Sequence, residues 1–188
     1  MTLVSEEFLV SRRVAQLFPE SLDVGYASVD TAREFRVMSD RGHETGVFLD
    51  SAGVYQFAEW FPGKEPSVTW WTNSTHAMEV ALTLMARRVG LTRGRITWRH
   101  PLPPGETFPG YEVDRAGAIL SVSWDSGQQW MKTIGIDFPH SEVAAMALWV
   151  PYSVDEIVES IDNPPGPVGL VPYRRFDRIS VQEALRDS

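Results

Sequence analysis

The stretch GVFLDSAGVYQFAEW, residues 46–60, decides the fold class that the sequence predicts. Two β-rich runs, Gly46–Asp50 and Val54–Trp60, flank the turn-forming residues at 50–53, which is the pattern of a β-hairpin. A hairpin joins neighbouring strands without a crossover helix, so its two strands pair in antiparallel fashion. The sheet that contains this stretch is therefore expected to be mostly antiparallel.

Similar short β-rich runs occur on both sides of this hairpin, separated by turn residues. Their order predicts consecutive hairpins rather than strand–helix–strand units. Together with the helical segments, they predict an α+β fold in which mostly antiparallel sheet is packed by a central helix and by C-terminal helices. The further predicted strands are Asp23–Val29, Glu34–Ser39, Ser67–Thr72, Arg95–Arg99, Thr107–Val113, Ala118–Trp124 and Gln128–Ile136.

The central helix is predicted over Ser74–Val89. Met78, Leu82 and Met85 recur there at spacings that place them on one side of a helix. The other predicted helices begin at candidate capping residues, and two of them begin with a capping box. They are Ser5–Phe18, Ser141–Trp149, Ser153–Ile161 and Val181–Arg186.

The domain organisation follows from the length of 188 residues and from where the helical and β-rich segments end. We expect one α+β domain over residues 1–171. We expect a C-terminal tail over residues 172–188, with the short helix Val181–Arg186 inside it.

The composition argues against several classes of protein. The formal net charge of −8 disfavours nonspecific binding to nucleic acid or to an anionic membrane, because both need clustered positive charge. The absence of cysteine excludes disulfides, and the four histidines have no zinc-binding spacing. The first residues carry acids where a signal peptide needs basic residues, and no apolar run approaches the roughly 20 residues that cross a bilayer. These features predict a cytoplasmic protein with no metal and no other cofactor.

The sequence contains no established catalytic motif: no nucleophile elbow, no glycine-rich phosphate loop and no dinucleotide fingerprint. His76, with Glu79 three residues later, is a candidate acid–base pair. A carboxylate near a helix N-terminus is also favoured by the helix dipole, and this structural explanation is preferred. We therefore predict no catalytic residue and no enzymatic activity.

The chain has seven tryptophans, and two of them are adjacent on a predicted strand. Because successive strand residues point to opposite faces, only one of Trp70 and Trp71 can enter the core. The other is exposed, covered by a helix, or placed at an interface, where tryptophan is a preferred anchor. Trp71 is therefore a candidate partner-binding residue.

The stretch LSVSWDSGQQW, residues 120–130, predicts a second hairpin with its turn at residues 125–127. Gly127 can supply the positive φ of a tight turn, and serines alternate with apolar residues before it. The polar side of this hairpin either faces solvent or belongs to a surface that contacts a partner. Asp125 and Gln129 are the contact candidates in this hairpin.

An acidic face is predicted on the helix Ser153–Ile161. Its carboxylates are Asp155, Glu156 and Glu159, with Asp162 directly after it. Neighbouring carboxylates on one solvated helix cannot straddle a substrate as a glycosidase pair does, so a catalytic role is disfavoured. The alternatives are a solvent-exposed face and a partner-facing patch, and the candidates for the latter are Asp155 and Glu159.

The second half of the chain resembles the bacterial immunity proteins of polymorphic toxin systems. The residues that carry the resemblance are FPGYEVDRAGAILSVSWDSGQQW, 108–130, and ALWVPYSVDEIVESIDNPPGPVG, 147–169. They are similar to the immunity protein 61 family, which is related in organisation to antitoxins against tuberculosis necrotizing toxin. The shared features are a Pro-Gly-Tyr strand, a polar hairpin, a helix that begins Ser-x-Asp-Glu and a proline-rich loop.

The resemblance implies a small cytoplasmic inhibitor that binds a cognate toxin enzyme in the producing cell and occludes it. By analogy with the related antitoxins, the toxin would be of the NAD glycohydrolase type. Two other functions stay open from the residues alone. One is a small-ligand-binding or enzymatic domain that uses His76, Glu79 and His100, and the other is an adaptor or chaperone of a secretion system.

Overall fold

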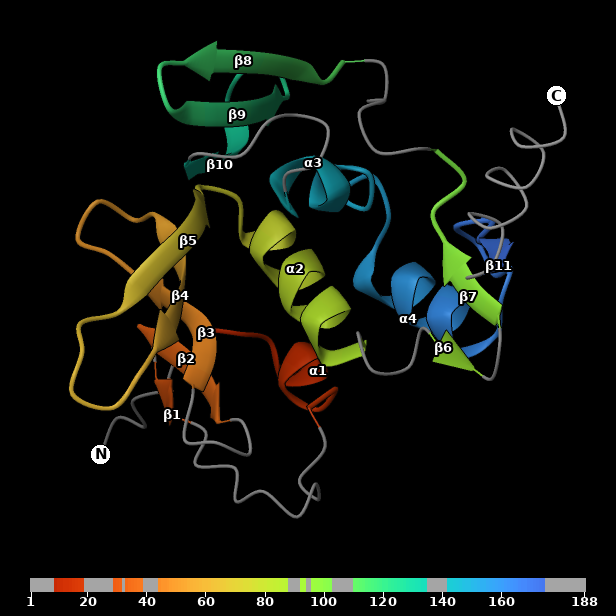
Figure 1. The fold of residues 1–188 in the computed structure, drawn as a ribbon, viewed down its shortest axis with the longest axis horizontal. Helices are drawn as coiled ribbons and strands as arrows, with labels where there is room; N and C mark the ends of the chain where they lie inside the picture. The colour runs from red at the N-terminus through yellow and green to blue at the C-terminus, as the bar shows by residue number, and fades with distance from the viewer. Residues whose placement is uncertain are drawn as a thin grey trace, which may run out of the picture.

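The computed structural model describes residues 9–18, 29–31, 33–38, 44–87, 92–93, 96–102, 110–134 and 142–174. The predicted α+β class is confirmed: a large antiparallel sheet is packed by helices (Figure 1). Within the described residues the large sheet has eight strands, in the order β1-β2-β3-β4-β5-β10-β9-β8. Their bounds are β1 Val29–Thr31, β2 Glu34–Met38, β3 Glu44–Leu49, β4 Tyr55–Trp60, β5 Ser67–Thr72, β8 Glu112–Ala116, β9 Ile119–Trp124 and β10 Gln129–Ile134.

A smaller antiparallel sheet and the helices complete the described fold. The small sheet has the order β11-β7-β6, and in it residue 171 and residues 172–174 of the expected tail pair with β7. Its strands are β6 Thr92–Arg93, β7 Ile96–Arg99 and β11 Val171–Arg174, and the helices are α1 Arg12–Ala15, α2 Thr75–Arg87, α3 Glu142–Ala147 and α4 Val154–Asp162.

The predicted hairpin of residues 46–60 is confirmed as β3 and β4. The Oδ1 atom of Asp50 accepts hydrogen bonds from the backbone N–H groups of Ala52 and Val54, at 2.8 and 3.0 Å. Its Oδ2 atom accepts a hydrogen bond from the side chain of Gln56 at 2.7 Å. The Val54 bond is the largest cause that lowers the pKa of Asp50 below its ordinary value. One carboxylate therefore fixes both the turn and the first residues of β4.

The two β-rich blocks join edge to edge through β5 and β10, which lie far apart in the sequence. Asn73, directly after β5, bonds the second block at two points. Its Nδ2 donates to the backbone oxygen of Gln128 at 2.7 Å, and its Oδ1 accepts from the Trp130 N–H at 2.9 Å. At the other end of the pairing, the Thr133 hydroxyl donates to the backbone oxygen of Thr69 at 2.9 Å. Polar side chains thus fix the register where no hairpin connects the strands.

The main core lies between the large sheet and helices α1, α2 and α3. The predicted helix stripe is confirmed at Met78 and Leu82, which are fully buried, and Met85 packs against the same cluster. Trp70 is the inward member of the tryptophan pair, and it stacks on Phe57 with ring centres 3.6 Å apart. The side chain of Ser74 accepts from the Ala77 N–H and so caps α2.

A second apolar cluster lies around α4, on the other side of α2 from the large sheet. Val80 contributes to it from α2, and Trp149, Ile157 and Leu170 contribute from the C-terminal part of the chain. The predicted capping box at the start of α4 is confirmed: the Glu156 N–H donates to the Ser153 hydroxyl oxygen, and the Glu156 carboxylate accepts from the Ser153 N–H.

Three predicted elements differ from the structure within the described residues. Of the helix predicted over Ser5–Phe18, residues 9–18 are described, and they are helical only at α1, where Ser11 is the N-cap and its N–H donates to the Glu79 carboxylate at 3.1 Å. The strand predicted to end at Val29 continues to Thr31. The strand predicted to end at Val113 continues to Ala116, because Gly117, with φ +63°, makes a two-residue turn into β9. The other parts of the predicted elements lie outside the described residues: 5–8, 23–28, 39, 88–89, 95, 107–109, 135–136, 141 and 181–186.

Candidate functional site

The large sheet has one face packed against the helices and one face turned away from them. Buried residues such as Val47 on β3 and Trp70 on β5 point from the sheet into the core, and β4, β9 and β10 also contribute buried residues to it. Because side chains alternate along a strand, the residue that follows each of them points to the opposite side of the sheet. We call this opposite side the outer face. None of the described helices packs against it (Figure 1). The outer face is therefore a candidate surface for binding a partner.

Three tryptophans lie on the outer face: Trp60 on β4, Trp71 on β5 and Trp130 on β10. All three are half-buried. Trp71 follows the buried Trp70 and therefore points outward, where its cross-strand neighbours are Gln56 and Lys132. The prediction that only one member of the tryptophan pair enters the core is confirmed. Trp71 is the outward member of the pair, and none of the described helices covers it.

Trp60 belongs to an aromatic and charged cluster at the β2–β4 end of the outer face. The guanidinium carbon of Arg36 lies 4.7 Å from the centre of the Trp60 ring, and the Phe48 ring meets Trp60 edge-on at 6.1 Å. Arg36 also forms ion pairs with Glu34 and Glu44, the latter at 2.9 Å. The hydrogen bond to Glu34 is the largest cause that raises the pKa of Arg36. The cluster holds its cation and its ring in fixed positions.

Trp130 forms a second cluster on β10. The Nζ atom of Lys132 lies 4.4 Å from the centre of the Trp130 ring. Lys132 is directly opposite Trp71 across the β5–β10 pairing, so Trp71 and Trp130 flank the same lysine. The side-chain oxygen of Asn73 accepts a hydrogen bond from the backbone N–H of Trp130 and thereby fixes Trp130 where β10 pairs with β5. The tertiary pairing, and not local sequence, brings these two tryptophans together.

A shallow depression of about 320 Å³ opens beside Trp60. Phe48, Leu49 and Pro66 provide its apolar lining, and Glu34 and Arg33 provide its charged rim. Specific small-molecule sites enclose most of the ligand surface, which an open depression of this kind does not do. The depression therefore lacks the enclosure of a small-molecule site.

The outer face has the chemistry of a protein-binding surface. Tryptophan and arginine are the side chains that most often dominate binding energy at interfaces, and cation–π contacts stabilise their positions before binding. Rigid aromatic rings also lose little conformational entropy when a partner covers them.

Asp125 and Gln129 lie at the end of the β9–β10 hairpin, next to the Trp130 cluster in sequence. Asp125 is exposed and has φ +53°, Ser126 has φ +54° and Gly127 has φ +81°. The predicted positive φ at Gly127 is confirmed. Asp125 and Ser126, for which the sequence predicted no such backbone angle, share this left-handed conformation. Gln129 alternates with Trp130, so its side chain points to the helix side of the sheet rather than to the outer face.

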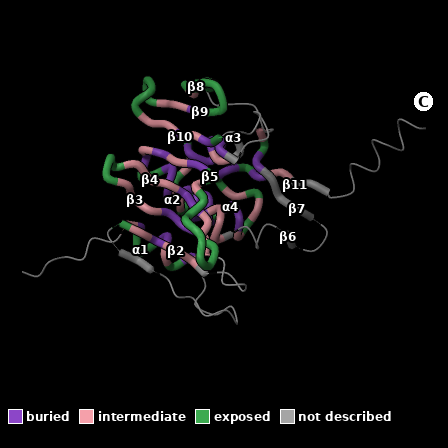
Figure 2. Tube along the Cα trace, turned by 60° about the vertical axis from the view of Figure 1, so that its left-hand side comes forward, coloured by how far each residue is buried: buried purple, intermediate pink, exposed green. Residues whose placement is uncertain are grey.

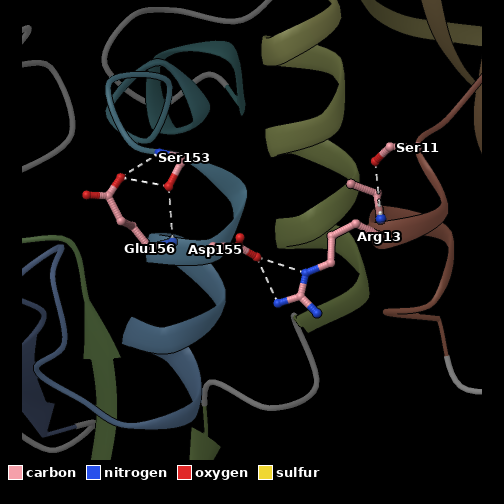
Figure 3. Close-up of polar contacts among 6 residues, drawn as sticks. Ser11, Arg13, Ser153, Asp155 and Glu156 are labelled. Atoms are coloured by element: carbon pink, nitrogen blue, oxygen red, sulfur yellow. Dashed lines mark hydrogen bonds and ion pairs between the residues drawn. The ribbon is translucent and has the colours of Figure 1, made fainter.

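Asp155 and Glu159 lie on α4, in the helical layer, and both are exposed. Asp155 accepts from the Nε and Nη2 atoms of Arg13, each at 2.8 Å, and so links α4 to α1 (Figure 3). The candidates from sequence therefore do not form one surface, because Trp71 belongs to the outer face and the two carboxylates belong to the opposite layer.

The candidate acid–base residues are separately engaged. The Nε2 atom of His76 lies 2.9 Å from the backbone oxygen of Val150, and Glu79 accepts from the Ser11 N–H. His100 is buried between Trp149 and Tyr152, and burial lowers its pKa. The three side chains make these contacts with different elements, so the structure favours packing and capping roles for them.

Among the described residues, no group of three or more histidine, aspartate or glutamate side chains could hold a metal ion. No described helix is long and apolar enough to span a membrane.

Sequence reasoning missed Trp60, Arg36, Trp130 and Lys132 as members of the site. In β10 the sequence pattern could have identified Trp130, because it lies two residues from Lys132 and so points to the same side of the strand as the lysine, opposite to the buried Met131. An aromatic residue in the polar phase of a strand indicates an outward-facing ring. The partnership of Arg36 with Trp60 had no such signal, because it depends on the β2–β3–β4 register.

Comparisons with known proteins identify a shared fold. No protein-family model matches the sequence, and no curated protein matches it. A solved structure of Rv3902c from M. tuberculosis is similar, with a TM-score of 0.61 and 15% sequence identity, over 92% of this chain and 98% of that chain. At this identity the likeness establishes the fold alone, and it does so over nearly the whole of both chains.

Proposed function

We propose that this protein is an immunity protein, or antitoxin, that binds a cognate bacterial toxin enzyme in the cytoplasm of the producing cell and occludes it. The observation that carries the proposal is the outer face, where Trp60, Trp71 and Trp130 lie half-buried on a sheet face that no described helix covers. An inhibitor of this kind needs a complementary surface rather than an active site.

Two further observations support the proposal. The sequence of residues 108–130 and 147–169 resembles immunity proteins. The first of these segments contains β8, β9 and the first two residues of β10. The net charge of −8 would speed encounter with a basic toxin. By the same resemblance, the toxin would be a NAD glycohydrolase.

The test is co-expression with the product of an adjacent gene that arrests growth of the host cell, with growth as the readout. We expect the unmodified protein to restore growth and to co-elute with the toxin on size exclusion. The double variant Trp71→Ala/Trp130→Ala is expected to lose at least about tenfold in affinity, since interface tryptophans often contribute 2 kcal/mol or more.

The matched control changes the other predicted surface. Asp155→Ala/Glu159→Ala removes only an exposed ion pair and one exposed carboxylate, so it should protect cells as the unmodified protein does. If this control fails and the tryptophan variant protects, the outer face is not the binding surface. If the protein elutes alone in the presence of the toxin, the occlusion proposal is wrong. A protein that leaves toxicity unchanged but is required for export of its neighbour would be a secretion adaptor.

A further inference from the structure

The strand β8 forms an edge of the large sheet. Within the described residues it pairs only with β9, and all five of its residues are exposed (Figures 1 and 2). The pairing with β9 runs without a register shift from Glu112 opposite Ser123 to Ala116 opposite Ile119. A regular edge strand presents backbone donors and acceptors that can pair with a further strand.

The turn between β8 and β9 determines which backbone groups face outward. A two-residue loop, Gly117-Ala118, joins the strands, so the closing pair Ala116 and Ile119 is a hydrogen-bonded pair. Hydrogen-bonded and non-hydrogen-bonded pairs then alternate along the ladder. Val113, opposite Val122, is in the second class, and its N–H and C=O groups therefore point away from β9.

The side chains of β8 give this edge a chemical character. The Val113 side chain lies on the helix side of the sheet and is 41% exposed, which makes it one of the large apolar side chains left open to solvent. Glu112 and Asp114 lie on the other side, with the outer face, and both are exposed. The helix side of this edge therefore carries Val113 and Arg115, and the outer side carries the two carboxylates.

A second copy of this chain does not suit the edge. Antiparallel pairing of two β8 strands about Val113 would place Glu112 opposite Asp114 of the other copy, and pairing about Asp114 would place Asp114 opposite itself. Like charges directly opposite each other on a sheet are destabilising. The same carboxylates attract an added strand that carries lysine or arginine at the opposing positions.

We infer that β8 is a strand-addition site for an extended segment of another protein, in which an apolar residue opposite Val113 is flanked by basic residues opposite Glu112 and Asp114. The backbone of the segment exchanges two hydrogen bonds with Val113, which gives affinity, and the alternating side chains give specificity. The acidic side chains of this site lie on the outer face two strands from Trp130, but the backbone pairing at Val113 involves none of the tryptophans and does not depend on the partner being a toxin.

The test uses a labelled synthetic peptide of about nine residues in which lysine and valine alternate. We expect saturable binding by fluorescence anisotropy, together with slower amide hydrogen exchange at Val113 on binding. The same peptide with N-methylated valines keeps its charge but cannot form the strand ladder, and its affinity should fall at least about tenfold.

Two variants of the protein complete the test. Val113→Pro removes only an outward N–H, so the unfolding midpoint should be nearly unchanged while peptide binding is lost. Glu112→Lys/Asp114→Lys should transfer binding from the lysine peptide to one that alternates glutamate and valine. Equal binding of the plain and N-methylated peptides, or unchanged exchange at Val113, would overturn the inference. So would a dimer of the unmodified protein that Val113→Pro dissociates.

Discussion

The Ser160 hydroxyl offers a sharp test of how the C-terminal loop is attached to the fold. Ser160 is fully buried on α4, and its Oγ atom donates to the backbone oxygen of Glu156 at 2.7 Å. The same atom accepts from the N–H of Val168 at 2.9 Å, across the loop of residues 163–167. Gly166 packs so closely here that a Cβ atom would lie 2.3 Å from the Ser160 Cα atom. One hydroxyl therefore connects the loop to the helix.

The change Ser160→Ala is expected to lower the free energy of unfolding by about 2–3 kcal/mol. Leaving the buried Val168 N–H without an acceptor costs about 1–3 kcal/mol, and the lost donation to Glu156 adds a further fraction. The Glu156 oxygen still accepts the helical N–H of residue 160, so that part of the loss is small. For a chain of 188 residues, this corresponds to a fall in Tm of roughly 4–12 °C.

Thr83 provides a matched control, because it is also fully buried in a helix and also donates to the oxygen four residues earlier, Glu79, at 2.8 Å. Within the part of the chain that the structure describes, its hydroxyl accepts no N–H from a distant loop. Thr83→Val should therefore cost at most about 1 kcal/mol.

Urea unfolding followed by tryptophan fluorescence measures both changes, since Trp149 lies in the same cluster as Val168. Amide exchange at Val168 should also become faster in Ser160→Ala alone. Equal losses for the two variants, within about 0.3 kcal/mol, would refute the role assigned to the Val168 bond.

Three further predictions concern the sheet. Because the pKa of Asp50 is lowered mainly by the Val54 N–H, its contribution to stability is complete above its ordinary pKa of 3.8 and is lost as the pH falls through the lowered value; Asp50→Asn should flatten the acid side of the stability profile measured by urea titration. Ser126→Gly should raise the free energy of unfolding by up to about 1 kcal/mol, because glycine has no steric penalty at φ +54°, and a loss of stability would contradict this. Gly46→Ala should lower it by about 2–3 kcal/mol, because a Cβ atom there would clash with the Phe35 backbone oxygen, and calorimetry would detect the fall in Tm.

Short-range sequence patterns predicted several elements. The turn at Asp50, the capping box at Ser153 and the stripe through Met78 and Leu82 each depend on residues within about one turn or hairpin of each other. Such patterns did not predict where α1 begins, because the N–H of Ser11 bonds to Glu79, which is 68 positions away. A contact at that separation has no local signal.

The candidate site shows the same division. Because strand geometry requires adjacent side chains to oppose each other, the sequence predicted that one of Trp70 and Trp71 points outward, and the burial of Trp70 shows that it is Trp71. The sequence did not place Trp130 beside Trp71, and it grouped Trp71 with Asp155, which lies in the helical layer.

The sequence by itself therefore determined the α+β class, the hairpins and the capping box of α4. These depend on backbone geometry and on neighbours a few residues away. Only the tertiary structure decided that β5 joins β10, and with it the composition of the outer face and the position of β8 at the edge. Strand edges are chemically alike along their backbones, so the choice between them rests on long-range side-chain bonds such as those of Asn73 and on burial of a shared core.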